Sequence, residues 1–174
     1  MGETVTTRLA YGAALARIAV NNPLVIELHG DTKNSTYSEK LRKAFPDREI
    51  ECFIAEQNLI SVIIGTVCRD RTMAFVSIFA TFFTQALRQI RVGAILQTNA
   101  NFVEFHCDVF IGEDGPLQMG LEDIVLFPTI PGPTVFYPSD AASTVAAVEL
   151  VANAKGVCFM RTSRANTAVI YGDD

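Results

Sequence analysis

Short runs of apolar residues alternate with helical patterns along almost the whole chain. The short runs predict strands, at residues 24–28, 51–54, 73–78, 101–109, 134–137 and 157–161. Helices are predicted between them, at residues 8–20, 38–45, 56–68, 82–96, 121–127 and 140–154, with Ser139 or Asp140 as the cap of the last. Strands that are apolar throughout and alternate with helices are typical of a parallel sheet covered on both faces. The predicted fold class is therefore α/β, with three α/β/α layers and a mostly parallel sheet.

Length and composition restrict the domain organisation and the partners. The 174 residues suit a single domain with a substantial core, and because no repeat, low-complexity tract or linker interrupts them, residues 1–174 are predicted to form one domain. A net charge of −5 argues against a nucleic-acid partner. No apolar run approaches the ~20 residues that span a bilayer, so no membrane association is expected. The four cysteines form no Cys-x-x-Cys pair, which favours reduced thiols and a cytoplasmic protein.

Polar and aromatic motifs follow several of the predicted strands. They occupy residues 30–36, 54–58, 79–83, 111–116 and 161–164. In parallel sheets, ligands bind beyond the carboxyl ends of the strands, so these motifs are predicted to form one site. Each has an ordinary explanation when taken alone. Glu56 can complement the dipole of the helix that it opens, Phe79 and Phe82 can be core residues, and residues 112–116 can be a simple turn.

Taken together, the motifs carry a resemblance to a known family. They read Gly-Asp-Thr-Lys-Asn-Ser-Thr, Ile-Ala-Glu-Gln-Asn, Phe-Ala-Thr-Phe-Phe, Ile-Gly-Glu-Asp-Gly-Pro and Arg-Thr-Ser-Arg. In this order the chain, from Arg8 to Tyr171, resembles the middle domain of an animal-type transketolase. The resemblance implies a domain that binds the aminopyrimidine ring of thiamine diphosphate. It implies a parent reaction that moves a two-carbon ketol unit from a ketose phosphate to an aldose phosphate.

The resemblance also assigns a role to individual residues. Glu56 matches the catalytic glutamate that bonds a nitrogen of the pyrimidine ring and exchanges a proton there, a task for a buried carboxyl. The expected cofactor-binding residues are Phe79, Phe82, Gln85 and Asp31. The expected substrate-binding residues are Arg8, Ser35, His106, Asp114, Gln118 and Arg164; among these, Arg8, Ser35 and Arg164 are expected to hold the sugar phosphate, which a planar guanidinium suits. Phe83 is expected in the core, and Arg161 and Lys33 are expected to be surface or interface charges.

Two departures from the family pattern concern the surroundings of these residues. Residues 104–110 read Glu-Phe-His-Cys-Asp-Val-Phe, where the family usually reads Gly-Ser-His-Cys-Gly-Val-Ser. Bulk and charge at Glu104, Phe105, Asp108 and Phe110 are expected to crowd or repel a cofactor and a phosphorylated sugar. His29 stands where an acidic residue is common.

A further expectation concerns the rest of the enzyme. The Gly-Asp-Gly…Asn motif that holds Mg²⁺ and the diphosphate has no match in the sequence. We therefore expect that the cofactor-diphosphate domain and the C-terminal domain are absent, that the metal is held outside this chain, and that the chain alone is inactive. The expected partners are sugar phosphates and the cofactor-diphosphate domain of a partner subunit, within a homodimer.

Two alternatives remain open at the level of sequence. A related thiamine diphosphate enzyme, such as a 2-oxoacid dehydrogenase component, would not explain the arginines or residues 30–35. A transketolase-like chain kept as a non-catalytic dimerisation or regulatory module is favoured by the departures at 104–110. The retained Glu56, Asp114 and Arg164 oppose that second alternative.

Overall fold

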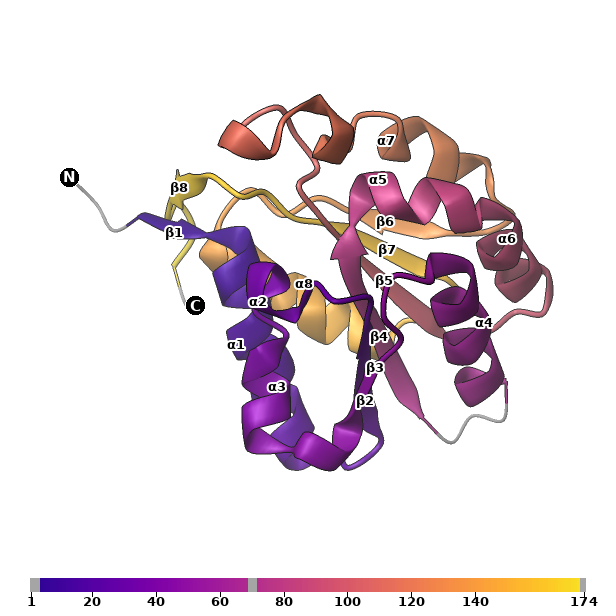
Figure 1. Ribbon diagram of the computed structural model, residues 1–174. Helices are drawn as coiled ribbons and strands as arrows, with labels where there is room; N and C mark the ends of the chain where they lie inside the picture. The colour runs from indigo at the N-terminus through magenta and orange to yellow at the C-terminus, as the bar shows by residue number, and fades with distance from the viewer. Residues whose placement is uncertain (1–3, 69–71, 173–174) are drawn as a thin grey trace.

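A six-stranded parallel sheet forms the centre of the computed structural model, which describes residues 4–68 and 72–172 (Figure 1). The strand order is β3-β2-β4-β5-β7-β6, and every neighbouring pair is parallel. The strands are β2 (Val25–His29), β3 (Glu49–Glu51), β4 (Met73–Phe79), β5 (Ala100–Phe105), β6 (Thr134–Phe136) and β7 (Cys158–Arg161). The predicted α/β class with a parallel sheet is confirmed.

Helices cover both faces of this sheet. On one face lie α1 (Thr7–Asn21), α3 (Glu39–Ala44) and α8 (Ala141–Asn153), and on the other lie α4 (Glu56–Val67) and α6 (Leu87–Ile95). The short helices α2 (Lys33–Thr36), α5 (Ala80–Phe83) and α7 (Asp123–Leu126) lie toward the carboxyl ends of the strands (Figure 1). Single 3-10 turns complete the helices: η1 (Pro46–Arg48), η2 (Thr84–Ala86), η3 (Gly112–Asp114), η4 (Pro116–Gln118) and η5 (Phe127–Thr129).

Two hydrophobic clusters explain why the strands are apolar throughout. Successive side chains of a strand point to opposite faces, so Phe75 packs against α1 and α8 while Val76 packs against α4 and α6. Phe102 and Val103 alternate in the same way on β5. Each such fully buried side chain contributes roughly 1.5–3 kcal/mol to folding. The strands are therefore largely apolar because the sheet is buried on both faces, as is usual for parallel sheets.

Some element boundaries differ from the prediction. Strand β3 occupies Glu49–Glu51 rather than residues 51–54, because Phe53 adopts a left-handed backbone conformation (φ 56°) and turns the chain toward α4. Strand β5 ends at Phe105 rather than at 109, because His106 is also left-handed (φ 59°). The helix predicted at 82–96 is divided into α5, η2 and α6.

A two-stranded antiparallel sheet was not predicted. Strand β1 (Thr4–Thr6) pairs with β8 (Asn166–Ala168), which brings the two ends of the chain together beside α1 (Figure 1). The cap predicted for the last long helix is confirmed, since Asp140 accepts a hydrogen bond from the Ser143 backbone N–H.

The expectations about cysteines and membrane spans can be compared with the described residues. Cys52, Cys68, Cys107 and Cys158 are all free thiols. Within residues 4–68 and 72–172, no helix has the length and apolar character required to cross a bilayer.

Candidate functional site

A cavity of about 540 Å³ lies at the edge of the sheet where the strands end. Among the described residues its lining consists of Arg8, Gly30, Asp31, Thr32, Ser35, Ile54, Glu56, Phe79, Phe82, Gln85, Asp114, Gln118 and Arg164. Every predicted site residue except His106 is in this set. The motifs that follow five different strands of the sheet, together with the start of α1, are thus brought to one place, as the rule for parallel sheets requires.

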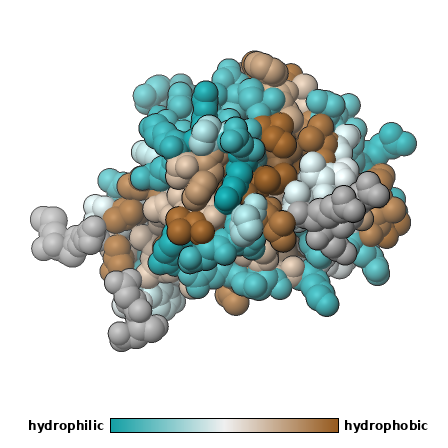
Figure 2. Space-filling view, turned by 90° about the horizontal axis from the view of Figure 1, so that it is seen from below, coloured by the Kyte–Doolittle hydropathy of each residue, from teal (hydrophilic) through white to brown (hydrophobic). Residues whose placement is uncertain are grey.

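A larger hollow of about 1060 Å³ lies at the opposite edge, where Met73, Asn101 and Val157 mark the beginnings of strands. Figure 2 looks onto that side of the molecule, where brown hydrophobic areas lie between teal hydrophilic residues. None of the predicted site residues lines this hollow. Because ligands of parallel sheets bind at the carboxyl edge, we assign the candidate site to the smaller cavity.

Glu56 is held at the cavity by the turn between β3 and α4. It is the first residue of α4 and is 7% exposed. The turn is packed tightly against the β2 end, since a Cβ on Gly30 would lie 2.8 Å from the Phe53 carbonyl oxygen. Glycine at position 30 therefore permits the close approach that places the Glu56 carboxyl in the cavity wall.

An aromatic wall faces this acid across the end of β4. The rings of Phe79 and Phe82 lie 5.2 Å apart, centroid to centroid, and both line the cavity. His106 stacks on Phe79 at 4.0 Å, so it lies behind that ring, outside the cavity lining. Both His106 nitrogens lack a hydrogen-bond partner among the described residues. Burial, and then the charges of Arg164 and Arg8, lower the pKa of His106 to about 4, so the imidazole is neutral at pH 7.

Two arginines converge on the other side of the cavity. Arg8 donates from Nη1 to the Ser35 carbonyl oxygen at 2.9 Å, while its buried Nε has no partner among the described residues. Arg164 donates to the Ile111 carbonyl oxygen at 2.6 Å and forms an ion pair with Asp114. Burial lowers the pKa of Arg8, and the charge of Arg164 adds to this effect. Two guanidinium groups that line one cavity favour an anionic ligand such as a phosphate.

The remaining predicted residues lie around the mouth of the cavity. Asp31 is exposed, adopts a left-handed conformation (φ 57°) and donates its backbone N–H to Glu51 at 2.8 Å. Gln118 and Gln85 complete the rim. Thr32 and Ile54 also line the cavity and were not predicted as site residues, although both lie in the motifs that follow β2 and β3.

One prediction about the charged residues outside the cavity is wrong. Arg161 was predicted to be a surface or interface charge and is instead 6% exposed. Its Nε donates to Asp123 at 2.6 Å and its Nη2 donates to the Cys107 carbonyl oxygen at 3.0 Å. Lys33 pairs with Glu51 at 3.0 Å. Phe83 is fully buried in the core, as expected.

The four departures at residues 104–110 do not crowd the cavity. Glu104 and Phe105 are fully buried in β5, and Phe105 packs against Tyr11 on the α1 side of the sheet. Phe110 is 73% exposed, and Asp108 accepts its backbone N–H. None of the four is among the described residues that line the cavity, so their side chains do not narrow it.

Glu104 should instead affect stability. Burial raises the pKa of its carboxyl well above the usual value, as does nearby Asp123, and neither oxygen has a hydrogen-bond partner among the described residues. The folded state therefore keeps a proton that the unfolded state releases above about pH 4.3, and stability is lost as pH rises from there.

We expect Glu104→Gln to remove this loss. Its free energy of unfolding, relative to wild type, should rise between pH 5 and pH 8 by about 1.4 kcal/mol for each pH unit over which the native carboxyl stays protonated. Urea unfolding at the two pH values measures the difference. The exposed Glu149→Gln is the matched control, and a pH-independent difference for Glu104→Gln would contradict a protonated buried carboxyl.

The fold and cavity define an α/β domain that combines a buried acid, an aromatic wall and a pair of arginines. The family model "Transketolase, pyrimidine binding domain" matches residues 3–169. The chain belongs to this family.

Individual relatives agree with the family match. Transketolase-like protein 2 of Mus musculus is 61% identical over 98% of this chain, and transketolase of Mus musculus is 54% identical over 100%. The chain spans only 27% and 28% of the lengths of these two relatives.

Solved structures give the same result for the fold. A structure described as "Split gene transketolase, inactive beta4 tetramer" has a TM-score of 0.86 and 32% identity, covering 99% of this chain and 56% of that one. Transketolase from Campylobacter jejuni has a TM-score of 0.89 at 21% identity, covering 98% of this chain and 27% of that one, which shows the fold alone.

Proposed function

We propose that this chain is the pyrimidine-binding part of a transketolase that transfers a two-carbon ketol unit from a ketose phosphate to an aldose phosphate. The observation that carries the proposal is the convergence of Glu56, the Phe79–Phe82 wall and the Arg8–Arg164 pair on one cavity. An acid and aromatic rings suit a polar heteroaromatic ring, and guanidinium groups suit a phosphate. One cavity thus combines groups suited to the cofactor ring with groups suited to the phosphate of the substrate.

The residues present fit the aminopyrimidine of thiamine diphosphate. Phe79 and Phe82 present aromatic surface for the face of a flat ring, and the largely buried Glu56 supplies one carboxyl to bond a ring nitrogen. In this proposal Glu56 holds and returns a proton at that nitrogen. Gln85 and Asp31 lie on the rim of the cavity and would border the cofactor there. When bound, the cofactor supplies the electron sink for the reaction.

The substrate side of the proposal rests on the opposite wall. Arg8, Ser35 and Arg164 hold the sugar phosphate, while Asp114 and Gln118 orient sugar hydroxyls. His106 is assigned to the same hydroxyls by its family position. In the conformation described here it lies behind Phe79, so this role requires either a shift of Phe79 or an indirect effect through that ring.

We further propose that the diphosphate and Mg²⁺ are held by a domain of a partner subunit within a homodimer. Large apolar side chains stand exposed near the cavity mouth, including Phe53 at 71%, Ile54 at 79% and Leu117 at 86%. Such a surface is typical of a protein interface. The free thiols also support a reducing, cytoplasmic location.

The observations favour catalysis over the non-catalytic alternative. That alternative rested on the departures at 104–110, and none of those side chains lines the cavity. A related enzyme that acts on 2-oxoacids would have no use for an arginine pair placed to bind a sugar phosphate. The acid, the aromatic wall and the arginines are all retained together.

Calorimetry can test whether the diphosphate is bound by a partner domain rather than by this chain. We expect the isolated chain to bind thiamine diphosphate with Mg²⁺ at a dissociation constant of about 1 mM or weaker, or roughly −4 kcal/mol, because the diphosphate partners lie in another domain. It should show no ketol transfer. Adding the separately produced diphosphate-binding domain should restore both tight binding and turnover. Tight binding by this chain alone would overturn the assignment of the diphosphate to a partner.

A further inference from the structure

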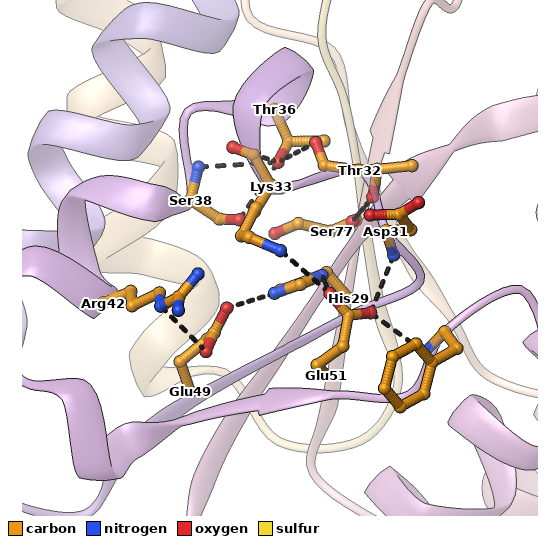
Figure 3. Close-up of polar contacts among 11 residues, drawn as sticks. His29, Asp31, Thr32, Lys33, Thr36, Ser38, Arg42, Glu49, Glu51 and Ser77 are labelled. Atoms are coloured by element: carbon orange, nitrogen blue, oxygen red, sulfur yellow. Dashed lines mark hydrogen bonds and ion pairs between the residues drawn. The ribbon is translucent and has the colours of Figure 1, made fainter.

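A second cluster of acidic and imidazole groups lies on the edge of the sheet, between β2 and β3. Glu27 and His29 are two residues apart on β2, so both point to the same face. The parallel register sets Glu27 beside Glu49 and His29 beside Glu51. Figure 3 shows His29 between Glu49 and Glu51, with Lys33 and Arg42 beyond them. None of these six residues lines the cavity described above.

His29 is positioned as a metal ligand with a supporting carboxylate. Its Nδ1 lies 3.1 Å from Glu51 Oε2, while its Nε2 is in direct contact with the Glu49 carboxylate. Glu51 is itself fixed, because it accepts the backbone N–H groups of Asp31 and Phe53 at 2.8 and 2.9 Å. Glu51 is thus close to Nδ1, although without hydrogen-bond geometry, and an ion placed between Nε2 and Glu49 would give the histidine a carboxylate beside its other nitrogen, as metal-bound histidines usually have.

Glu27 supplies an independent indication of a missing ligand. Its side chain is fully buried, and neither carboxyl oxygen has a hydrogen-bond partner of normal geometry among the described residues. The polar groups nearest to this carboxyl are the hydroxyls of Ser38, which accepts a hydrogen bond from Thr36, and of Ser77, which shares one with Tyr11. A buried carboxyl without a partner is costly, and a cation would remove that cost.

We propose that Glu27, His29 and Glu49 form a binding site for a divalent transition-metal ion of the zinc class. One ligand atom from each lies within 4.8 Å of those of the other two. Ligands about 2.0–2.2 Å from a tetrahedral zinc ion stand roughly 3.4 Å apart, so small side-chain rotations close the site around the ion. The mixture of imidazole and carboxylate favours zinc over magnesium, which prefers oxygen ligands alone.

Charge and access are consistent with this site. Lys33 lies 3.0 Å from Glu51, and Arg42 lies 3.7 Å from Glu49, so the two nearby cations pair with the outer carboxylates and leave Glu27 without one. The side chain of Glu49 is 9% exposed and that of Glu51 is 21% exposed. β3 is the edge strand of the sheet, and its Glu49 is the most exposed of the three proposed ligands.

The site would also connect to the cavity. Glu51 holds both His29 and the Asp31 backbone, and Asp31 lines the cavity mouth. Metal binding at His29 would therefore fix the loop after β2 that contributes Asp31, Thr32 and Ser35.

The test titrates Zn²⁺ and Co²⁺ into the metal-free chain, with Cys68→Ser as the background because that thiol is exposed. We expect one Zn²⁺ per chain, a higher thermal midpoint, and a Co²⁺ ligand-field spectrum without a thiolate charge-transfer band. Glu27→Gln and His29→Gln should weaken binding by more than the roughly 10–100-fold loss expected for the supporting change Glu51→Gln. Glu149→Gln, an exposed acid on α8, should bind as wild type does.

Three outcomes would overturn the site. They are no Zn²⁺ binding by wild type at 100-fold molar excess, a thiolate band in the Co²⁺ spectrum, or equal binding by wild type, Glu27→Gln and His29→Gln. The first outcome would leave His29 and Glu49 as a simple ion pair. Because the Co²⁺ spectrum is measured on chains with all three ligands, the test does not depend on whether each variant folds.

Discussion

Replacing Arg8 with methionine should lower kcat/KM for phosphorylated sugars by roughly 10- to 100-fold in a full-length protein that carries this domain, since a hydrogen bond to a charged group contributes about 1.5–3 kcal/mol. Arg8 has a buried Nε without a partner among the described residues and lies at the cavity beside Ser35. Methionine keeps most of the aliphatic stem but removes the charge. The loss should therefore fall on phosphate binding rather than on folding.

Two comparisons isolate that cause. An unphosphorylated sugar should react equally well with wild type and Arg8→Met, because the arginine has no phosphate to bind. Arg17→Met, on the same helix but exposed and paired with Glu149 at 2.5 Å, should react as wild type does with both sugars. If Arg8→Met lowers the rates for both sugars equally, or if Arg17→Met matches it, Arg8 is not a phosphate ligand.

Patterns within single segments made the fold predictable. The apolar runs at 73–78 and 157–161 became β4 and β7 almost without change, because a strand buried on both faces is apolar at most positions. Asp140 was predictable as a cap from its place before an Ala/Val-rich helix. The position of the site followed from the same reasoning, since parallel strands end at one edge.

Contacts between distant segments could not be predicted in this way. Left-handed backbone at Phe53 and His106 shortens two strands, and neither is a glycine, the residue for which that conformation is readily predicted. Arg161 is buried because Asp123 lies 38 residues away in sequence yet 2.6 Å away in space. The departures at 104–110 were predicted to crowd the cavity because a linear motif shows neither which face of β5 Glu104 and Phe105 occupy nor where the loop after β5 carries Asp108 and Phe110.

The cluster of Glu27, His29 and Glu49 could not be predicted from the sequence either. As a sequence, Glu27 is one charge within an apolar run, and His29 is one residue before a glycine. The register between β2 and β3 is what sets these groups together, and that register is a property of the sheet rather than of either segment. A cluster of this kind is visible only in the structure.

The central assignment is that Glu56 is the carboxyl that works on the cofactor ring. Glu56→Gln in a full-length protein should lower turnover by about 10²- to 10⁴-fold, the usual contribution of general acid–base catalysis. Glutamine keeps the shape of the side chain and can still bond a ring nitrogen. It cannot hold and return a proton. Stability should be retained or rise, because a largely buried carboxyl becomes a neutral amide.

The opposing explanation is that Glu56 only complements the dipole at the start of α4. It predicts the reverse pattern, with a stability loss of about 0.3–1 kcal/mol and unchanged turnover. Glu149→Gln serves as the control for a carboxyl-to-amide change at an exposed helical position.

The most direct test is therefore to measure the steady-state turnover and the thermal midpoint of the same Glu56→Gln preparation. If Glu56 works on the cofactor ring, turnover falls by at least about 100-fold and the midpoint equals or exceeds that of wild type. Turnover that stays within about threefold of wild type, which is under 1 kcal/mol of transition-state stabilisation, would show that Glu56 is not the catalytic carboxyl.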